Sequence, residues 1–170
     1  VYTTGKEMTQ IMDTFTKMSG NNYSPGTITG KPIPVGGSLA RNVATGLGNA
    51  YCIREAAKIL NIELKGAKVV LQGFGNASTF SGVYLEKEGA ICIAASDSKG
   101  SILVPDGFKV QELIDWKQKE GSVVGYPGSK EISTEELLTT ECDVLVPGAL
   151  ENQITAAIAE KLKCKIIGEA

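Results

Sequence analysis

From residue 68 onward, short apolar runs alternate with segments of helical periodicity, and this alternation restricts the fold more than any other feature of the chain. The predicted strands are residues 69–71, 90–95, 144–146 and 165–167, and the predicted helices are 79–87, 109–120 and 155–162. Strands interleaved with helices are typical of parallel sheets that carry helices on both faces. The sequence therefore predicts an α/β fold with a doubly wound, mostly parallel sheet.

The first 45 residues follow a different pattern. Residues 6–18 place apolar side chains at helical spacing, whereas residues 20–37 contain too many glycines, prolines and asparagines for regular structure. A second helical pattern covers residues 45–60. We expect residues 1–45 to form a helix and a Gly/Pro-rich connecting segment between domains, and residues 46–170 to form the α/β domain.

A glycine turn follows the first predicted strand and reads Gly73-Phe-Gly-Asn-Ala-Ser78. This G-x-G-x-x-S pattern in a strand-turn-helix context is a version of the Rossmann-like dinucleotide-binding fingerprint. We expect Gly73 to allow a tight turn and Gly75, at a positive φ, to let the backbone approach a pyrophosphate at the helix N-terminus. Ser78 stands where Gly or Ala is usual, so modest crowding is expected. The alternative is an ordinary strand-to-helix turn.

An acidic residue follows the second predicted strand. Asp97 lies 24 positions after Gly73, close to where such folds place the acid that binds the adenosine ribose. The alternative is an Asx turn leading into Lys99 and Gly100. Because Ser98 and Lys99 could receive a 2′-phosphate, the pattern favours NAD over NADP only slightly.

Composition excludes several function classes. The chain has no histidine, so it cannot form a Ser-His-Asp triad or a His-ligated zinc site, and its four cysteines lack a C-x-x-C pair. We therefore expect no metal site. With 17 basic and 19 acidic side chains the net charge is −2, which argues against nucleic acid as a partner. No apolar run approaches the roughly 18 residues that span a bilayer, and residues 1–20 carry no signal-peptide core, so we expect a cytoplasmic protein without a membrane partner.

Four collinear blocks carry a family resemblance: residues 30–46 (GKPIPVGGSLARNVATG), 72–76 (QGFGN), 96–100 (SDSKG) and 147–152 (PGALEN). Together they resemble the glutamate dehydrogenases of the amino-acid dehydrogenase superfamily, and the G-G-S-x-x-R-x-x-A-T-G block resembles the glutamate branch in particular. The resemblance implies reversible oxidative deamination of L-glutamate to 2-oxoglutarate and ammonia, with hydride passing to a nicotinamide cofactor. It also implies a homo-hexamer for the full-length protein.

The same resemblance assigns roles to individual residues. It places Thr45 at the nicotinamide carboxamide, Asn76 near the pyrophosphate and ribose, and Asn152 at the nicotinamide ribose. Helix capping is the alternative for these three residues, and an ion pair is the alternative for Arg41. The implied cofactor-binding set is Arg41, Thr45, Gly73, Phe74, Gly75, Asn76, Ala77, Asp97, Ser98, Gly148, Ala149 and Asn152.

Several positions depart from the family pattern. Ala77-Ser78 replaces Val-Gly or Val-Ala, Ala40 replaces Gly, and Gly148 replaces Ala or Cys. The family's catalytic lysine and aspartate would precede Val1, and part of its substrate site would follow Ala170. We therefore expect no catalytic residue in this chain, which would bind cofactor without turnover as a part of a longer enzyme. The alternatives are a self-standing, non-catalytic dinucleotide-binding module and an S-adenosylmethionine-dependent transferase.

Overall fold

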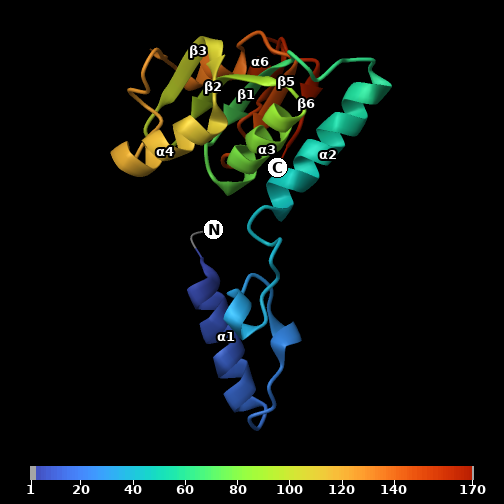
Figure 1. Ribbon diagram of the computed structural model, residues 1–170, viewed down its shortest axis with the longest axis vertical. Helices are drawn as coiled ribbons and strands as arrows, with labels where there is room; N and C mark the ends of the chain where they lie inside the picture. The colour runs from blue at the N-terminus through green and yellow to red at the C-terminus, as the bar shows by residue number, and fades with distance from the viewer. Residues whose placement is uncertain (1–2, 170) are drawn as a thin grey trace. The chain divides into compact units, whose positions relative to one another are not determined.

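The structure is a computed structural model that describes residues 3–169, and the chain divides into two compact units. The first unit ends at Ala44 and the second begins at Thr45. In the first unit, helix α1 (Gly5–Met18) precedes two short 3₁₀ turns, η1 (Pro25–Thr27) and η2 (Ile33–Val35) (Figure 1). Apart from these two turns, the described residues between α1 and Ala44 form neither helix nor strand, as their glycines and prolines predict.

Local contacts order the first unit. Helix α1 begins with a capping box, in which the Thr4 hydroxyl accepts a hydrogen bond from the Lys6 amide and the Glu7 carboxylate accepts one from the Thr4 amide. In the connecting segment, the buried Lys31 ammonium donates to the carbonyl oxygens of Pro25, at 2.6 Å, and Ile28. The segment that lacks regular structure is thus folded around one lysine side chain.

The second unit contains a six-stranded sheet with the order β4-β3-β2-β1-β5-β6. Its strands are β1 (Lys68–Gln72), β2 (Ile91–Ser96), β3 (Ser101–Phe108), β4 (Lys130–Ile132), β5 (Val144–Pro147) and β6 (Ile166–Ile167). The pairs β1–β2, β1–β5 and β5–β6 are parallel. The predicted α/β class with a mostly parallel sheet is confirmed.

Strands β3 and β4 were not predicted, and they pair antiparallel to β2 and to each other. Strand β3 could not be predicted from the sequence because Pro105, Asp106 and Gly107 favour turns over strands. They are tolerated because β3 is exposed or half-buried there, while its start at Ser101 and Ile102 is buried. Strand β4 is a short, charged edge strand that gives no apolar signal.

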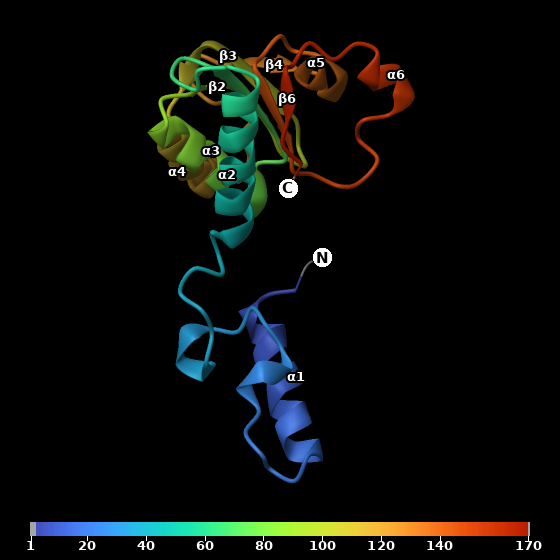
Figure 2. The same ribbon diagram turned by 90° about the vertical axis from the view of Figure 1, so that its right-hand side faces the viewer.

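Helices cover both faces of the sheet (Figure 2). Helices α2 (Ala44–Ile59), α3 (Asn76–Lys87) and α4 (Val110–Glu120) pack on one face, and α5 (Thr134–Leu138) and α6 (Ala156–Ala159) lie on the other. Helix α5 was not predicted, and α6 is half the predicted length. Among residues 3–169, no helix combines the length and apolarity needed to cross a bilayer.

Candidate functional site: the carboxyl edge of the parallel strands

The candidate site lies where the carboxyl ends of β1, β2 and β5 meet. Hydrogen bonds join the three ends: the Gly73 amide donates to Ser96 Oγ at 3.0 Å, and the Gly148 amide donates to the Gln72 carbonyl at 3.0 Å. Open α/β sheets bind ligands at this edge. The fold thereby brings most of the predicted set together, namely Gly73, Phe74, Gly75, Asn76, Ala77, Asp97, Ser98, Gly148 and Ala149.

The two glycines of the turn differ. Gly73 has φ +77°, and a Cβ added there would lie 2.8 Å from the Gly148 carbonyl oxygen and 2.9 Å from the Ala149 amide. Gly75 has φ −104°, so the expectation of a positive φ at this residue was wrong, and Gly73 has that conformation instead. A Cβ on Gly75 would meet only the Gly73 carbonyl oxygen, at 4.0 Å. Gly73 thus serves the packing of the turn, and Gly75 leaves the space in front of it open.

The N-terminus of α3 faces this open space. Helix geometry leaves the first amides, those of Asn76, Ala77 and Ser78, without intrahelical acceptors, and within the described chain no side chain caps the helix. Asn76 is exposed and is the first helical residue, so the alternative that it acts only as a helix cap is wrong. Free amides at the positive end of a 12-residue helix form an anion site suited to a pyrophosphate.

Gly46 brings Thr45 to the same place. A Cβ on Gly46 would lie 2.5 Å from Phe80 Cβ and 2.7 Å from the Ala77 carbonyl oxygen, so α2 and α3 approach as closely as a glycine permits. The Ser81 hydroxyl donates to the Gly46 carbonyl at 3.2 Å and fixes the contact. Thr45 is exposed beside this contact, and α2 already begins at Ala44, so capping is not the role of Thr45.

Asn152 lies in the segment that follows β5. It is exposed with φ +60°, and Thr155 caps α6, so the capping alternative for Asn152 is also wrong. Asn152, Gln153 and Ala149 line a cavity of about 550 Å³. Arg41 belongs to the first unit, and its role in cofactor binding stays a prediction.

Ser78 and Gly148 form a complementary pair. The buried Ser78 hydroxyl donates to the Gln72 carbonyl at 2.9 Å, and a Cβ on Gly148 would lie 2.0 Å from Ser78 Oγ. The crowding expected from Ser78 is therefore relieved by the missing side chain at residue 148. The two departures from the family pattern compensate for each other.

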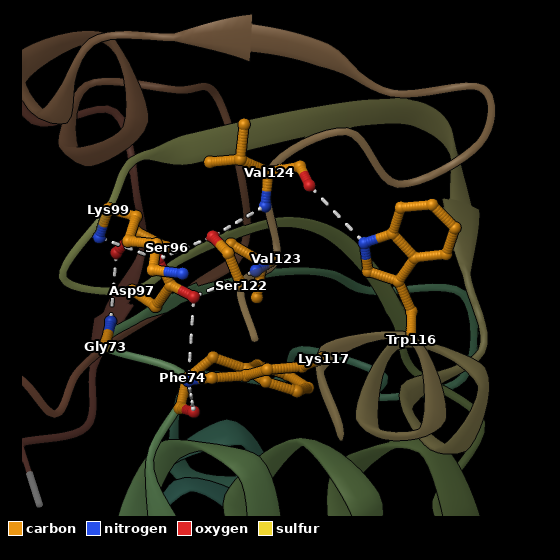
Figure 3. Close-up of polar contacts among 10 residues, drawn as sticks. All are labelled: Gly73, Phe74, Ser96, Asp97, Lys99, Trp116, Lys117, Ser122, Val123 and Val124. Carbon is orange, nitrogen blue, oxygen red and sulfur yellow. Dashed lines mark hydrogen bonds and ion pairs between the residues drawn. The ribbon is translucent and has the colours of Figure 1, made fainter. Parts of the chain in front are cut away.

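The Asp97 carboxylate, at the end of β2, accepts hydrogen bonds from other residues of the chain (Figure 3). Its side chain is 6% exposed. One oxygen accepts from the Lys99 amide at 2.9 Å and the Ser122 hydroxyl at 3.2 Å, and the other accepts from the Val123 amide at 2.8 Å. The Lys117 ammonium lies 3.7 Å from the second oxygen. The Asx turn that was the alternative for Asp97 is present, and the ribose contact stays a prediction.

The surroundings of Asp97 favour its ionised form. Burial opposes ionisation, but the Lys99 and Val123 amides, the Lys117 charge and the Ser122 hydroxyl outweigh it and hold the pKa of Asp97 below its ordinary value. The carboxylate therefore provides a fixed negative charge whose hydrogen-bonding capacity is largely used within the protein.

Lys117 is a residue of this site that sequence reasoning missed. Its ammonium donates to the Phe74 carbonyl at 2.7 Å and lies 5.9 Å from the centroid of the Phe74 ring (Figure 3). One lysine on α4 thereby connects the glycine turn to Asp97. The helical pattern of residues 109–120 predicted the element but contained no signal for a contact 43 residues away.

Two of the four cysteine thiols are buried in the core. All four cysteines are free thiols, and burial raises the pKa of Cys92 and Cys142 to about 12, so neither is a thiolate at neutral pH. Residues 3–169 contain no cluster of His, Cys, Asp or Glu side chains that would hold a metal ion. The open turn at Gly75 and the uncapped N-terminus of α3 are features that can bind an anionic group.

A family model described as Glutamate/Leucine/Phenylalanine/Valine dehydrogenase matches residues 36–170. The chain belongs to this family. This membership confirms the resemblance and excludes the transferase alternative. Among the relatives, the NAD-specific glutamate dehydrogenase of Clostridioides difficile is 39% identical over 100% of this chain and 41% of its own length. The glutamate dehydrogenase of Thermotoga maritima is 43% identical over 99% of the chain and 41% of its own length.

Solved structures give the same result. The hetero-hexameric glutamate dehydrogenase of Thermus thermophilus, in its Leu-bound form, superposes with a TM-score of 0.91 and 30% identity over the whole chain and 40% of its own. The glutamate dehydrogenase of Plasmodium falciparum superposes with a TM-score of 0.87 and 29% sequence identity. The match covers 99% of this chain and 38% of the length of that enzyme. The chain spans about two fifths of the length of these relatives.

Proposed function

We propose that this chain is the NAD-binding portion of a glutamate dehydrogenase. The observation that carries the proposal is the open turn at Gly75 in front of the uncapped N-terminus of α3. Similarity to the NAD-specific glutamate dehydrogenase of Clostridioides difficile supports both the cofactor and the substrate.

Each part of the site then has a binding role. The amides of Asn76 and Ala77 would hold the pyrophosphate, while Thr45 and Asn152, which are exposed and make no side-chain hydrogen bond within the described chain, would hold the nicotinamide end. Asp97 would lie at the adenosine end as a negative charge that disfavours a 2′-phosphate. NADP is the less favoured cofactor because of this charge, but Lys117 offsets part of it, so the preference for NAD is small.

The bound nicotinamide would supply the hydride acceptor for oxidation of L-glutamate to 2-oxoglutarate and ammonia. This chain's residues would bind and orient the cofactor rather than transfer protons, because the resemblance places the catalytic lysine and aspartate outside them. We therefore expect the 170-residue chain to bind NAD without oxidising glutamate. The alternative, a self-standing binding module, has no observation in its favour.

Assembly and location belong to the same proposal. Similarity to the hetero-hexameric enzyme of Thermus thermophilus supports a hexamer for the full-length protein, for which we propose identical subunits. Four free cysteines suit a reducing compartment, which supports the cytoplasm.

Calorimetric titration of the purified chain with NAD and with NADP tests the proposal. The expected result is saturable binding with NAD tighter than NADP, and no glutamate-dependent formation of NADH. Absence of NAD binding, or tighter binding of NADP, contradicts the cofactor assignment. Turnover by the homogeneous chain contradicts the assignment of the catalytic groups to residues outside it.

A further inference from the structure

Gln72, the last residue of β1, connects three parts of the candidate site. Its carbonyl oxygen accepts hydrogen bonds from the Ser78 hydroxyl and the Gly148 amide. Its side chain is directed elsewhere: Nε2 donates to Gln153 Oε1 at 3.0 Å, and Gln153 Nε2 donates to the Glu151 carbonyl at 3.3 Å. A chain of two amides thus runs from the central strand to the segment of residues 149–153.

This amide is maintained at a cost to stability. Gln72 is only 2% exposed, and its Oε1 is buried without a hydrogen-bond partner among the described residues. A buried carbonyl without a donor loses its hydration and receives nothing in return. An apolar side chain of similar length, such as methionine, would fill the same space without that loss. Packing therefore does not explain a glutamine here, and the bond to Gln153 is what the amide provides.

The segment that receives this bond needs an anchor. Residues 148–155 form neither helix nor strand, and Asn152 within them has the left-handed conformation, at φ +60°. Asparagine adopts this conformation more readily than most other residues, so the positive φ does not by itself fix the segment, which also lacks the hydrogen bonds of a helix or strand. Gln153, the neighbour of Asn152, is the residue that Gln72 contacts.

We propose that Gln72 is a positioning residue for the cofactor. Through Gln153 it holds the 149–153 segment so that the Asn152 side chain faces the nicotinamide end of the ligand. This inference rests on the proposed function, because it assigns Asn152 to the cofactor. Gln72 itself acts through Gln153 and needs no contact with the ligand.

The test compares Gln72→Met, Gln153→Met and the double variant by NAD titration and thermal unfolding. Loss of one positioning hydrogen bond predicts roughly tenfold weaker NAD binding in each single variant. The double variant should bind no more weakly than the singles, because both substitutions break the same relay. The melting temperature of Gln72→Met should stay unchanged or rise, since an unpaired buried carbonyl is removed.

Gln111→Met provides the matched control. Gln111 is an exposed glutamine on α4 that bonds Asp115, so its loss should change neither binding nor melting temperature. If Gln72→Met lowers the melting temperature and leaves NAD affinity within twofold of the parent, Gln72 is a structural residue and the proposal is wrong. Independent, additive losses in the double variant also overturn it.

A second measurement separates this inference from the proposed function. Amide resonances of residues 150–153 are compared by NMR between the parent and Gln72→Met without any cofactor. The proposal expects shifted or broadened resonances in this segment and unchanged ones in α4. If the parent fails to bind NAD, the proposed function fails, while unchanged resonances of residues 150–153 would overturn the positioning role by themselves.

Discussion

The two ends of the candidate site are prepared in opposite ways. At the glycine turn the chain leaves polar groups free: the first amides of α3 are uncapped, and the exposed side chains of Thr45 and Asn76 make no hydrogen bond within the described residues. At the end of β2, both oxygens of Asp97 already accept hydrogen bonds, and Lys117 lies beside them.

This difference separates binding from architecture. Free donors and an open turn contribute little to the folded chain alone, so substitutions there should affect the ligand and spare stability. The Asp97 cluster joins β2, the 122–124 segment and α4, so substitutions there should affect stability first. Residues that match a family motif equally well thus have different physical roles.

Gly75→Val, at the glycine turn, has the largest expected effect on NAD binding. The valine methyl groups would occupy the space before the α3 amides, and NAD binding should weaken by more than about a hundredfold, or roughly 3 kcal/mol. Stability should fall by no more than about 1 kcal/mol: valine is a poorer N-cap for α3 than glycine, but φ −104° suits it and the added Cβ meets only one atom at 4.0 Å. Calorimetric titration measures the first effect and thermal unfolding the second.

Gly26→Val is the control, since a Cβ on Gly26 meets nothing within 4 Å. It should leave NAD binding unchanged. NAD binding by Gly75→Val within twofold of the parent would show that the turn is not the pyrophosphate site.

Gly148→Ala tests packing beneath the same turn. The new methyl would overlap Ser78 Oγ, and overpacking of this kind should cost about 3 kcal/mol. Ser78→Gly in the same chain removes the hydroxyl, and the nearest remaining atom, the residue 78 amide nitrogen, lies 3.4 Å away. Urea unfolding of both single variants and the double variant should therefore show a favourable coupling. Simple additivity would mean that the two positions do not compensate.

Asp97→Asn tests the end of β2, where both carboxylate oxygens accept hydrogen bonds within the protein. Losing charge-assisted hydrogen bonds to two amides should cost about 2 kcal/mol at pH 7. Because the folded-state pKa of Asp97 is lowered, its contribution is present above its ordinary pKa of about 3.9 and is lost as the pH falls through the folded value. The parent and the variant should therefore converge in stability as the pH falls below this ordinary pKa, as measured by urea unfolding.

The control is Asp115→Asn on the exposed side of α4, which should stay within about 0.5 kcal/mol of the parent at every pH. A stable Asp97→Asn variant that binds NAD more than tenfold more weakly would reverse the comparison. Asp97 would then be a ligand contact first, as its position after β2 predicted.

Thr45→Val gives the smallest expected effect. The exposed hydroxyl has no partner in the described chain, so unfolding free energy should change by less than about 0.5 kcal/mol. NAD affinity should fall by about 1 kcal/mol, or roughly fivefold, for one lost hydrogen bond. Thr134→Val, an exposed threonine on α5, should change neither quantity. If Thr45→Val lowers the unfolding free energy and leaves NAD affinity unchanged, Thr45 has a structural role like that of Asp97.

Much of the fold could be predicted because its signals are local. The apolar run before Gly73 and the helical periodicity after it define β1 and α3 within a few residues, although α3 begins at Asn76 rather than residue 79. Strand β3 was not predicted, because its extended conformation comes from pairing with β2 and not from the local preferences of Pro105 and Gly107. Strand β4 was too short and too charged to show an apolar pattern.

The site was predictable where a motif implies backbone geometry, and not where it depends on distant side chains. The pattern located the turn, but the assignment of positive φ to Gly75 failed because the pattern does not show which glycine packs against Gly148 and Ala149. The contacts of Lys117 with Phe74 and of Gln72 with Gln153 join residues 43 and 81 positions apart. No local property of a sequence encodes such pairs.

The strand order also has a consequence for how quickly parts of the chain fold. Strand β2 pairs with β3 across a short turn, with Ser96 opposite Ser101, whereas β1 pairs with β5 through Val69 and Val144. Closing the longer loop costs more chain entropy, so the central β1–β5 ladder should form late. Val144→Ala should accordingly accelerate unfolding in stopped-flow experiments while leaving refolding almost unchanged, and Ile102→Val should slow refolding. The site's edge would then be the last part of the sheet to assemble, since Gly148 reaches Gln72 only after β5 has joined β1.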